Sequence, residues 1–320
     1  MSENSTGGTA VRPGQEHFVA PLEETPLAAV DAVDDSAPSG GLFSDAWKQL
    51  RKRPMFIVPC LIILLIAVVS LFPSWFTSQD PRFVDLSVAL DPPSAEHPLG
   101  VTRAGTDVYA RLVHGARASV SVGLLTTAIV VLVGGVVGAL AGFFGGWLDA
   151  LLSRVVDIFF ALPLILGAIV LLQTLNGRNV LTVAVTLALF GWPQVARIMR
   201  SSVLQVRSAE YVTAAKSLGL GRTGTLVRHV IPNAIGPVIV VATISLGTFI
   251  AAEATLSFLG LGLPPNIVSW GGDIAQAQQV LRTDPWILLW PGLGLSLTVL
   301  SFLMLGDALR DALDPKGRTR

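Results

Sequence analysis

The sequence has little that could support catalysis or hold a metal. Its single cysteine, Cys60, lies in an apolar run, so no internal disulfide or thiolate cluster can form. The four histidines, His17, His97, His114 and His229, are too scattered to assemble a three-ligand metal site. No glycine-rich phosphate loop of the form G-x-x-x-x-G-K-[ST] occurs, and no pairing of a nucleophile with a base is visible. We therefore predict a chain that is not an enzyme, with no catalytic residue, no metal and no cofactor of its own.

Charge is also scarce. Charged residues make up only 14% of the 320, hydrophobic residues make up 52%, and the mean hydropathy is +0.64. In a soluble domain about a quarter of the residues are charged, so this composition indicates a polytopic membrane protein. The 22 Lys and Arg balance the 22 Asp and Glu, and no basic run is interleaved with aromatic residues. Nucleic-acid binding is therefore excluded.

Six largely uncharged stretches are long enough to cross a bilayer, which requires about 20 residues each. A seventh apolar stretch, 254–272, is broken by LGLGLPPN and follows the fifth with no room for a turn, so we predict a loop and a partial helix there. The predicted fold is an all-α membrane bundle of six transmembrane helices. The predicted spans are 54–76, 118–144, 155–176, 179–200, 229–252 and 285–306.

The distribution of Lys and Arg predicts the orientation, because these residues favour the cytoplasmic side of short loops. With both termini inside, most of them fall in cytoplasmic segments, including Arg310 to Arg320 at the end of the chain. We then expect a disordered acidic cytoplasmic tail over 1–41 and an interfacial helix over 42–53 that lies against membrane lipid. Residues 77–115 and 253–284 would be extracytoplasmic, and 307–320 would be a cytoplasmic tail.

The cytoplasmic loop 207–226 contains the most informative segment, which reads EYVTAAKSLGLGRTGTLVRHVIPN from Glu210. Tyr211, Ala214, Ala215 and Leu218 fall at i, i+3, i+4 and i+7, which places a shallow apolar stripe on one face of a short helix. A stripe of this size can enter a groove on a cytoplasmic partner.

The ends of this helix are also marked in the sequence. We expect Ser208 to cap its N-terminus and Glu210 to complement the helix dipole in the first turn. Gly219 is expected to end the helix in left-handed geometry, directly after Leu218.

With Glu210, Ala214, Ala215, Gly219 and Pro232 at the places of the motif, the segment resembles the EAA loop of importer-type ABC permeases. Its HVIPN ending is typical of the peptide branch. The resemblance to dipeptide and oligopeptide permeases, specifically the partner of the pair usually written second, runs from about residue 47 to residue 315. It continues through HPLGVTRAGTDVYARLVHGARASV, GWLDALLSRVVDIFFALP, AEATLSFLGLGLPPNIVSWGG and LGDALRDALDP. The pattern departs at Thr106, where relatives have an arginine between Gly105 and Asp107, and often at Ala110, where they have serine.

The resemblance implies a bundle of the type I ABC importer permease class with a cytoplasmic coupling helix, in a bacterial plasma membrane. It implies one half of a pseudo-symmetric pair with a second homologous permease subunit, and passage of short peptides by alternating access. Two cytoplasmic ATPase subunits or domains would bind ATP and Mg²⁺ and dock on the EAA helix, and an extracytoplasmic peptide-binding protein would deliver the cargo. Nickel, glutathione or haem are alternative cargoes of this branch. A proton-coupled secondary carrier is an alternative from another class, although the spans lack buried acids at mid-depth.

Two acidic residues lie at the edges of predicted spans. Glu253, at the outer end of the fifth, is either an outer-gate or substrate contact or, in the reading we favour, the partner of an outer arginine such as Arg117. Asp157, at the inner start of the third, is expected to pair with Arg154 or a neighbouring loop.

Overall fold

The computed structural model describes residues 50–51, 53–175 and 177–313, and these residues are almost entirely helical. The predicted disordered tail 1–41 lies outside the described residues. So do 42–49 and 52 of the predicted interfacial helix, and 314–320 of the predicted C-terminal tail.

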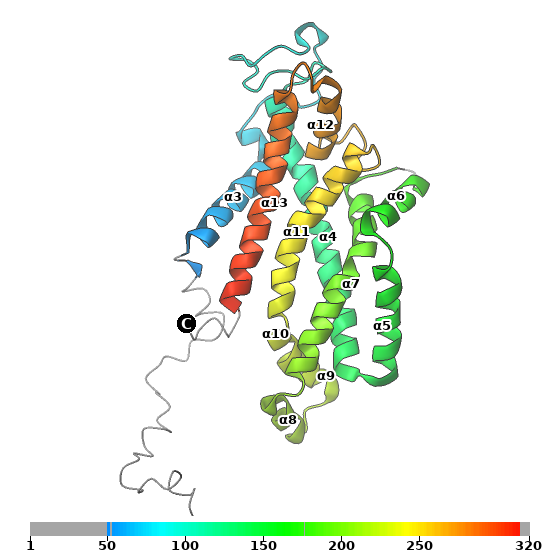
Figure 1. Ribbon diagram of the computed structural model, residues 1–320. Coiled ribbons are helices and arrows are strands. Elements are labelled where there is room, and N and C mark those ends of the chain that lie inside the picture. The colour runs from blue at the N-terminus through cyan, green and yellow to red at the C-terminus, as the bar shows by residue number, and fades with distance from the viewer. Residues whose placement is uncertain (1–49, 52, 176, 314–320) are drawn as a thin grey trace, which may run out of the picture. The chain divides into compact units, whose positions relative to one another are not determined.

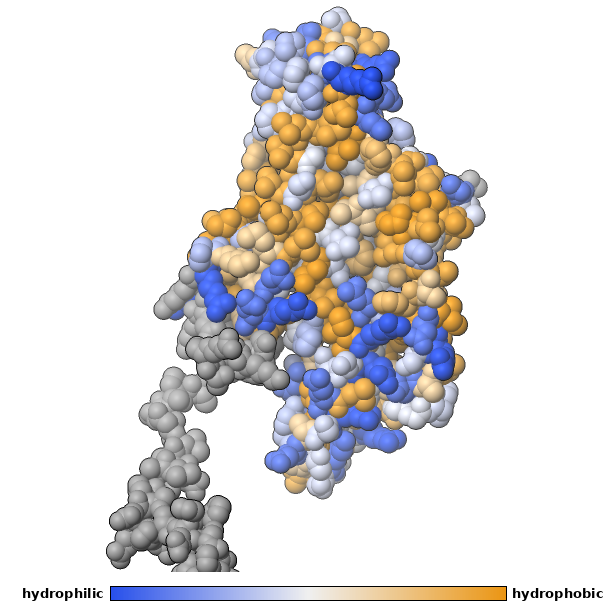
Figure 2. Space-filling view, viewed as in Figure 1, coloured by the Kyte–Doolittle hydropathy of each residue, from blue (hydrophilic) through white to orange (hydrophobic). Residues whose placement is uncertain are grey.

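Within the described residues, five helices are long and apolar enough to cross a membrane. The consecutive helices α5 (Gly146–Phe160) and α6 (Leu164–Thr174) form a sixth span if the two are counted as one. Figure 2 shows apolar residues in a broad band between two polar ends. The all-helical membrane fold predicted from the sequence is confirmed. The five single spans are α3 (Pro54–Leu71), α4 (Val108–Phe144), α7 (Val180–Val206), α11 (Gly236–Phe258) and α13 (Trp286–Leu313).

The shorter elements lie at the two ends of the bundle (Figure 1). At one end, residues 77–107 and α12 (Trp270–Ala277) cover the ends of α4 and α13. This end also contains the 3₁₀ turns Pro73–Trp75, Leu86–Val88 and Gln278–Val280. At the other end lie α8 (Glu210–Ser217), α9 (Arg222–Thr225), a π-helical turn over Leu226–Val230 and α10 (Ile231–Ala234). Following the orientation and the coupling segment predicted from the sequence, we call these two ends the outer end and the coupling end.

The third predicted span, 155–176, differs from the structure. The chain forms two helices there, α5 and α6, which are bent by 80° at the break between them. Pro163 occupies the N-cap position of α6, and a proline disfavours the helical conformation of the residue before it. The apolar run is continuous across this break, so composition alone predicted one uninterrupted segment.

Several helices extend beyond the predicted spans. Helix α4 begins at Val108, well before residue 118, because the Asp107 carboxylate caps it by accepting a hydrogen bond from Ala110 N at 2.6 Å. At their C-terminal ends α7, α11 and α13 continue to Val206, Phe258 and Leu313. Charged residues end an apolar run but are good helix formers, so hydropathy located the membrane-facing part of each helix and missed its polar extension.

Helix α4 packs against α7 along a line of glycines. A Cβ added at Gly134, Gly138 or Gly142 would lie 2.3–2.8 Å from a backbone oxygen of α7. These three positions are four residues apart and therefore share one helix face. Glycines that allow two backbones to approach closely are a known basis of helix contact in membranes. Close packing of α4 on α7 is therefore present at these three positions, whereas a Cβ added at Gly135 of the same helix would meet nothing within 4 Å.

Candidate coupling surface and outer network

Helix α8 ends in a Schellman motif centred on Gly219. Gly219 has φ +87°, and its N–H donates to Lys216 O at 3.0 Å, while Leu220 N donates to Ala215 O at 3.2 Å. These two bonds satisfy carbonyl groups that would otherwise be unpaired at the helix end. An added Cβ on Gly219 would meet nothing within 4 Å, so the requirement for glycine comes from the left-handed backbone alone. The predicted glycine stop has the expected geometry.

The predicted N-cap is wrong by one residue. Ala209 occupies the N-cap position of α8 and makes no side-chain capping bond. The Ser208 hydroxyl instead donates to Gln205 O at 2.9 Å in the preceding turn, so it belongs to the end of α7. Glu210 does lie in the first turn of α8, where a negative charge complements the helix dipole.

The predicted apolar stripe of α8 is largely uncovered in this chain. The Leu218 side chain is 89% exposed and that of Tyr211 is 46% exposed, while Ala214 is exposed and Ala215 half-buried. The residue that fixes α8 to the bundle is Val212, which is fully buried in a cluster with residues of α5, α7 and α10. One face of the helix is therefore held, and the face that carries the stripe is free of contacts from the described residues that would bury it.

The segments around α8 are tied to the ends of α4 and α7. Arg207, directly after α7, donates from Nη1 to Gly142 O at 2.6 Å, which satisfies a carbonyl near the C-terminus of α4. The Lys216 ammonium lies 5.7 Å from the centre of the Phe143 ring. Pro232 is exposed near the start of α10, beyond the π-helical turn, and is not part of the α8 stripe. The predicted coupling residues thus separate into α8 with its glycine stop and a distant proline.

At the outer end, Glu253 of α11 is the centre of a buried hydrogen-bond network. Its carboxylate accepts from Ser119 Oγ of α4 at 3.0 Å and from Ser257 Oγ at 2.7 Å. Each serine oxygen in turn accepts a backbone N–H, Ser119 from Trp270 at 3.3 Å and Ser257 from Leu263 at 3.1 Å. One carboxylate therefore orients two hydroxyls that hold the loop after α11 and the start of α12.

The favoured prediction that Glu253 pairs with Arg117 is wrong. Glu253 is fully buried, and among the described residues no ion pair joins it to an arginine. Arg117 is exposed on α4. Hydroxyl donors replace the cation because α4 presents Ser119, two positions further along, toward α11. Asp157 behaves as expected: it lies 3.8 Å from Arg154 and 2.8 Å from Arg197.

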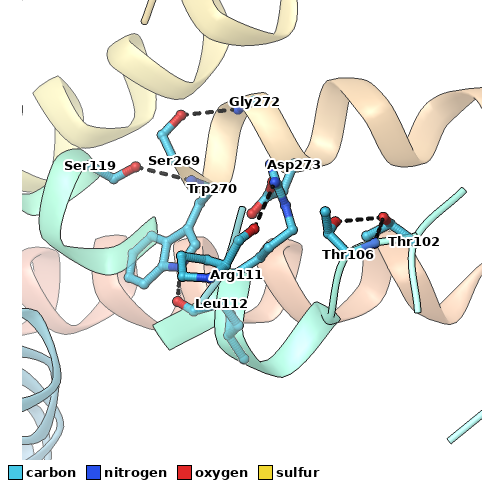
Figure 3. Close-up of polar contacts among 10 residues, drawn as sticks. Thr102, Thr106, Arg111, Leu112, Ser119, Ser269, Trp270, Gly272 and Asp273 are labelled. Carbon is cyan, nitrogen blue, oxygen red and sulfur yellow. Dashed lines mark hydrogen bonds and ion pairs between the residues drawn. The ribbon is translucent and has the colours of Figure 1, made fainter. Parts of the chain in front are cut away.

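A second buried group, Asp273 of α12, joins the same region to α4 (Figure 3). Arg111 donates from both Nε and Nη2 to Oδ1 of Asp273, and Trp270 Nε1 donates to Leu112 O at 2.9 Å. The Oδ2 atom of Asp273 is buried without a hydrogen-bond partner among the described residues. Burial raises the pKa of Asp273 to about 6, although the Arg111 guanidinium acts in the opposite direction.

Thr106, where the sequence departs from the pattern expected for the family, takes a local structural role. Its hydroxyl lies 2.7 Å from that of Thr102, and its N–H donates to the same Thr102 oxygen (Figure 3). Gly105 beside it has φ +75°, and a Cβ there would lie 2.3 Å from Asp85 O. Asp107 also accepts from His97 at 2.9 Å. This turn fixes the start of α4 without an arginine.

Sequence reasoning missed Val212, Ser119, Ser257 and Asp273. Val212 was off the helical stripe and gave no periodic signal. The serines are common packing residues in membrane helices, and the partners of Glu253 and Asp273 on α4 lie 134 and 162 positions away in the sequence. The available signal was that Asp273 is the second acidic residue, after Glu253, in a largely apolar outer segment.

Comparison with known proteins agrees with these features. Residues 134–319 match the family described as the binding-protein-dependent transport system inner membrane component, and residues 41–93 match the N-terminal TM domain of oligopeptide transport permease C. The chain is 38% identical over 292 residues to the dipeptide transport system permease protein DppC of Alkalihalophilus pseudofirmus, which covers 91% of this chain and 96% of that protein. It is 36% identical over 297 residues to the oligopeptide transport system permease protein OppC of Bacillus subtilis, covering 93% and 97%. It is also 35% identical over 298 residues to the glutathione transport system permease protein GsiD of Escherichia coli, covering 93% and 96%.

Proposed function

Because the chain belongs to the family of binding-protein-dependent transport system inner membrane components, we propose that it is the transmembrane permease subunit of an ATP-driven importer for short peptides. The observation that carries the proposal is the combination of this family membership with a folded, uncovered helix at the coupling end of the bundle. A transport subunit of this kind performs no chemistry itself.

The cargo proposed is a di- or oligopeptide. Relatives over nearly the whole chain are named for dipeptide and oligopeptide transport, at 36–38% identity. Relatives named for glutathione transport, at 34–35%, support glutathione as the second candidate cargo. A proton-coupled carrier would be expected to hold buried acids near the middle of its spans.

Energy would come from two cytoplasmic ATPase subunits, which bind ATP and Mg²⁺ and receive the face of α8 formed by Tyr211, Ala214 and Leu218. An apolar stripe on a short helix suits insertion into a groove, as other helix-in-groove contacts do. Glu210 and Gly219 define the two ends of this helix. Val212 anchors α8 to the bundle, so a displacement of α8 would be transmitted to the spans.

The transport cycle we propose is a two-state exchange. An extracytoplasmic binding protein would deliver peptide at the outer end, and this chain with a second homologous permease subunit would enclose the path. Nucleotide binding would bring the ATPases together, move the two coupling helices and favour the outward-facing arrangement; hydrolysis would restore the inward-facing one. Both termini and α8 would be cytoplasmic, in agreement with the excess of Lys and Arg on that side.

Reconstitution tests this proposal. The complete complex in vesicles, with binding protein outside, should take up labelled di- to pentapeptides when ATP is supplied to the ATPases, and the purified permease subunit alone should hydrolyse no ATP above background. Glutathione, nickel and haem are measured in the same vesicles. Uptake of only a non-peptide cargo would overturn the peptide assignment. Uptake without the ATPases, driven by a pH gradient, would overturn the importer assignment as well.

A pair of substitutions tests the docking surface directly. Leu218→Asp places a charge on the uncovered stripe and should abolish co-purification of the ATPases from detergent extracts. Val227→Asp changes a residue outside the stripe that is also exposed, at 61% against 89% for Leu218, and should retain them. Equal retention by both variants would contradict docking through this face of α8.

A further inference from the structure

The outer end of the bundle contains an open cavity of about 610 Å³. The loop after α3 forms one wall, and the first turns of α4 form another. Val180 at the start of α7 and Ile267 with Val268 before α12 complete it. A volume of this size lies within the range of small-molecule sites, about 300–1,000 Å³. We call it the outer cavity.

Positive charge on its walls is not neutralised within the chain. Arg117 and Arg82 both line the outer cavity, and among the described residues neither guanidinium makes a hydrogen bond or an ion pair. His114 lies one helical turn before Arg117, and its Nδ1 contacts Ala110 O at 3.0 Å, which leaves Nε2 for another partner. Guanidinium groups are suited to binding carboxylates with paired hydrogen bonds.

The same cavity holds one negative charge. The Asp80 carboxylate lines it, and Oδ1 accepts a hydrogen bond from the backbone N of Arg82 at 2.9 Å. Asp80 forms no ion pair with the described residues. A site with two unpaired arginines and an unpaired aspartate suits a ligand that carries both charges, because the arginines attract a carboxylate and Asp80 attracts an ammonium group.

We propose that the outer cavity is the site where the permease receives the peptide, with Arg117 and Arg82 binding its terminal carboxylate and Asp80 its terminal ammonium group. This inference rests on the proposed function and adds the recognition of a free, zwitterionic peptide by the permease itself. Ser121 and Thr77 can bond to the peptide backbone, and Ala118, Ile267 and Val268 provide apolar surface for its side chains.

The walls of the outer cavity are held by the network around Glu253. Ser119, which donates to Glu253, lies between Arg117 and Ser121 on α4, and its oxygen accepts from Trp270 N, close to Val268. The two walls contributed by α4 and by the loop before α12 are therefore fixed to each other. Pre-organised charges bind a ligand at lower entropic cost than mobile ones.

Photolabelling of the complex in vesicles, without binding protein, tests the site. The probe is a dipeptide of alanine and a diazirine analogue of leucine. In the wild type, labels should map by mass spectrometry to residues 74–82, 114–121 or 267–268, and dialanine should compete. Dialanine amide and N-acetyl-dialanine should compete about tenfold less well, since each has lost one charge-assisted interaction.

Variants assign each end of the peptide. Arg117→Gln should remove the difference in competition between dialanine and its amide, and Arg117→Lys should largely retain that difference. Asp80→Asn should remove the difference in competition between dialanine and its N-acetyl form. Arg282→Gln changes an exposed arginine at the same end of the bundle that does not line the outer cavity; it is the matched control and should behave as the wild type.

Two results would overturn the inference. One is labelling outside these segments, or a difference between dialanine and its amide that Arg117→Gln leaves unchanged, while the complete system still takes up peptide; the proposed function would then stand without this site. The other is protection by vesicles containing phosphatidylethanolamine with no competition by dialanine, which would assign the charges to a zwitterionic lipid headgroup. Failure of the complete wild-type system to take up any peptide would overturn the proposed function itself, and the receiving site with it.

Discussion

Ser119 of α4 and Glu253 of α11 are joined by a hydrogen bond of 3.0 Å, donated by the hydroxyl and fully buried. A buried acceptor shared by two hydroxyls is costly to remove, because each donor loses its partner. The pair therefore connects two spans and, through the oxygen of Ser119, the start of α12.

Glu253→Ala is expected to lower the free energy of unfolding by about 2–4 kcal/mol, since it leaves a cavity and two unsatisfied hydroxyls. Thermal unfolding in detergent measures the loss. Glu253→Gln, which keeps the volume and one carbonyl acceptor, should lose less. Thr255→Ala, on the exposed side of the same helix, is the control and should change little. Equal midpoints for Glu253→Ala and Thr255→Ala would show that the network does not stabilise the outer end.

Gly219→Val should insert and fold but fail to couple. A β-branched side chain in left-handed geometry costs about 1–2 kcal/mol, which would distort the turn that presents Leu218. We expect substrate-stimulated ATP hydrolysis to fall at least about fivefold, the factor that such an energy represents. Gly221→Ala provides the control, because Gly221 has φ −62° and open space around it. Wild-type stimulation of ATP hydrolysis by substrate in Gly219→Val would show that the glycine stop of α8 is not needed for coupling.

Asp273 predicts a specific dependence of stability on pH. Burial raises its pKa from 3.8 to about 6, so the folded state holds a proton that the unfolded chain releases. Its contribution to stability is therefore complete below pH 3.8 and is lost as the pH rises to about 6. The unfolding temperature of the wild type should fall across this range for that reason.

Asp273→Asn should flatten this part of the profile, whatever its effect on absolute stability through Arg111. Asp91→Asn changes an exposed carboxylate in the other outer segment, 77–115, and should leave the slope in place. A slope unchanged in Asp273→Asn would contradict the assignment to this group.

The orientation of the chain can be read by cysteine labelling in a Cys60→Ser background. A cysteine at Ser94 or Asn266, both exposed at the outer end, should react with an impermeant thiol reagent added outside. One at Ser208 or Thr319 should react only after the membrane is opened. Outside labelling at Thr319 would refute cytoplasmic placement of both termini.

Features set by residues close together in the sequence could be predicted, and contacts between distant segments could not. Gly219 was predictable because a helix stop is set by a few neighbouring residues, and the spans were predictable because apolar runs alone place a segment in lipid. The N-cap was missed because Ser208 had two backbone partners within reach and bonds to Gln205 O. The break between α5 and α6 lies within one continuous apolar run, so hydropathy did not locate it, although a proline such as Pro163 is expected to kink or end a span.

The partners of Glu253 and Asp273 could not be predicted, because packing of distant spans selects them. Ser119 and Arg111 occupy the right turns of α4 only once α4 lies against α11 and α12. Arg117, on the same helix, was the predicted partner of Glu253. The rotation of α4 about its own axis directs Ser119 toward Glu253 in its place.

Helix α7 links the two ends of the bundle mechanically. It runs for 27 residues, which corresponds to about 40 Å at 1.5 Å per residue. Its first residue, Val180, lines the outer cavity, and the chain continues from its last residue through Arg207 to α8. Between these ends, α7 packs closely against the glycines of α4. A tilt of about 10° around its midpoint would move both ends by about 3–4 Å in opposite directions. Rigid tilting of α7 would therefore convert a displacement of α8 into an opposite displacement of the outer cavity wall at Val180. No stepwise rearrangement of side-chain contacts between the two ends would be needed.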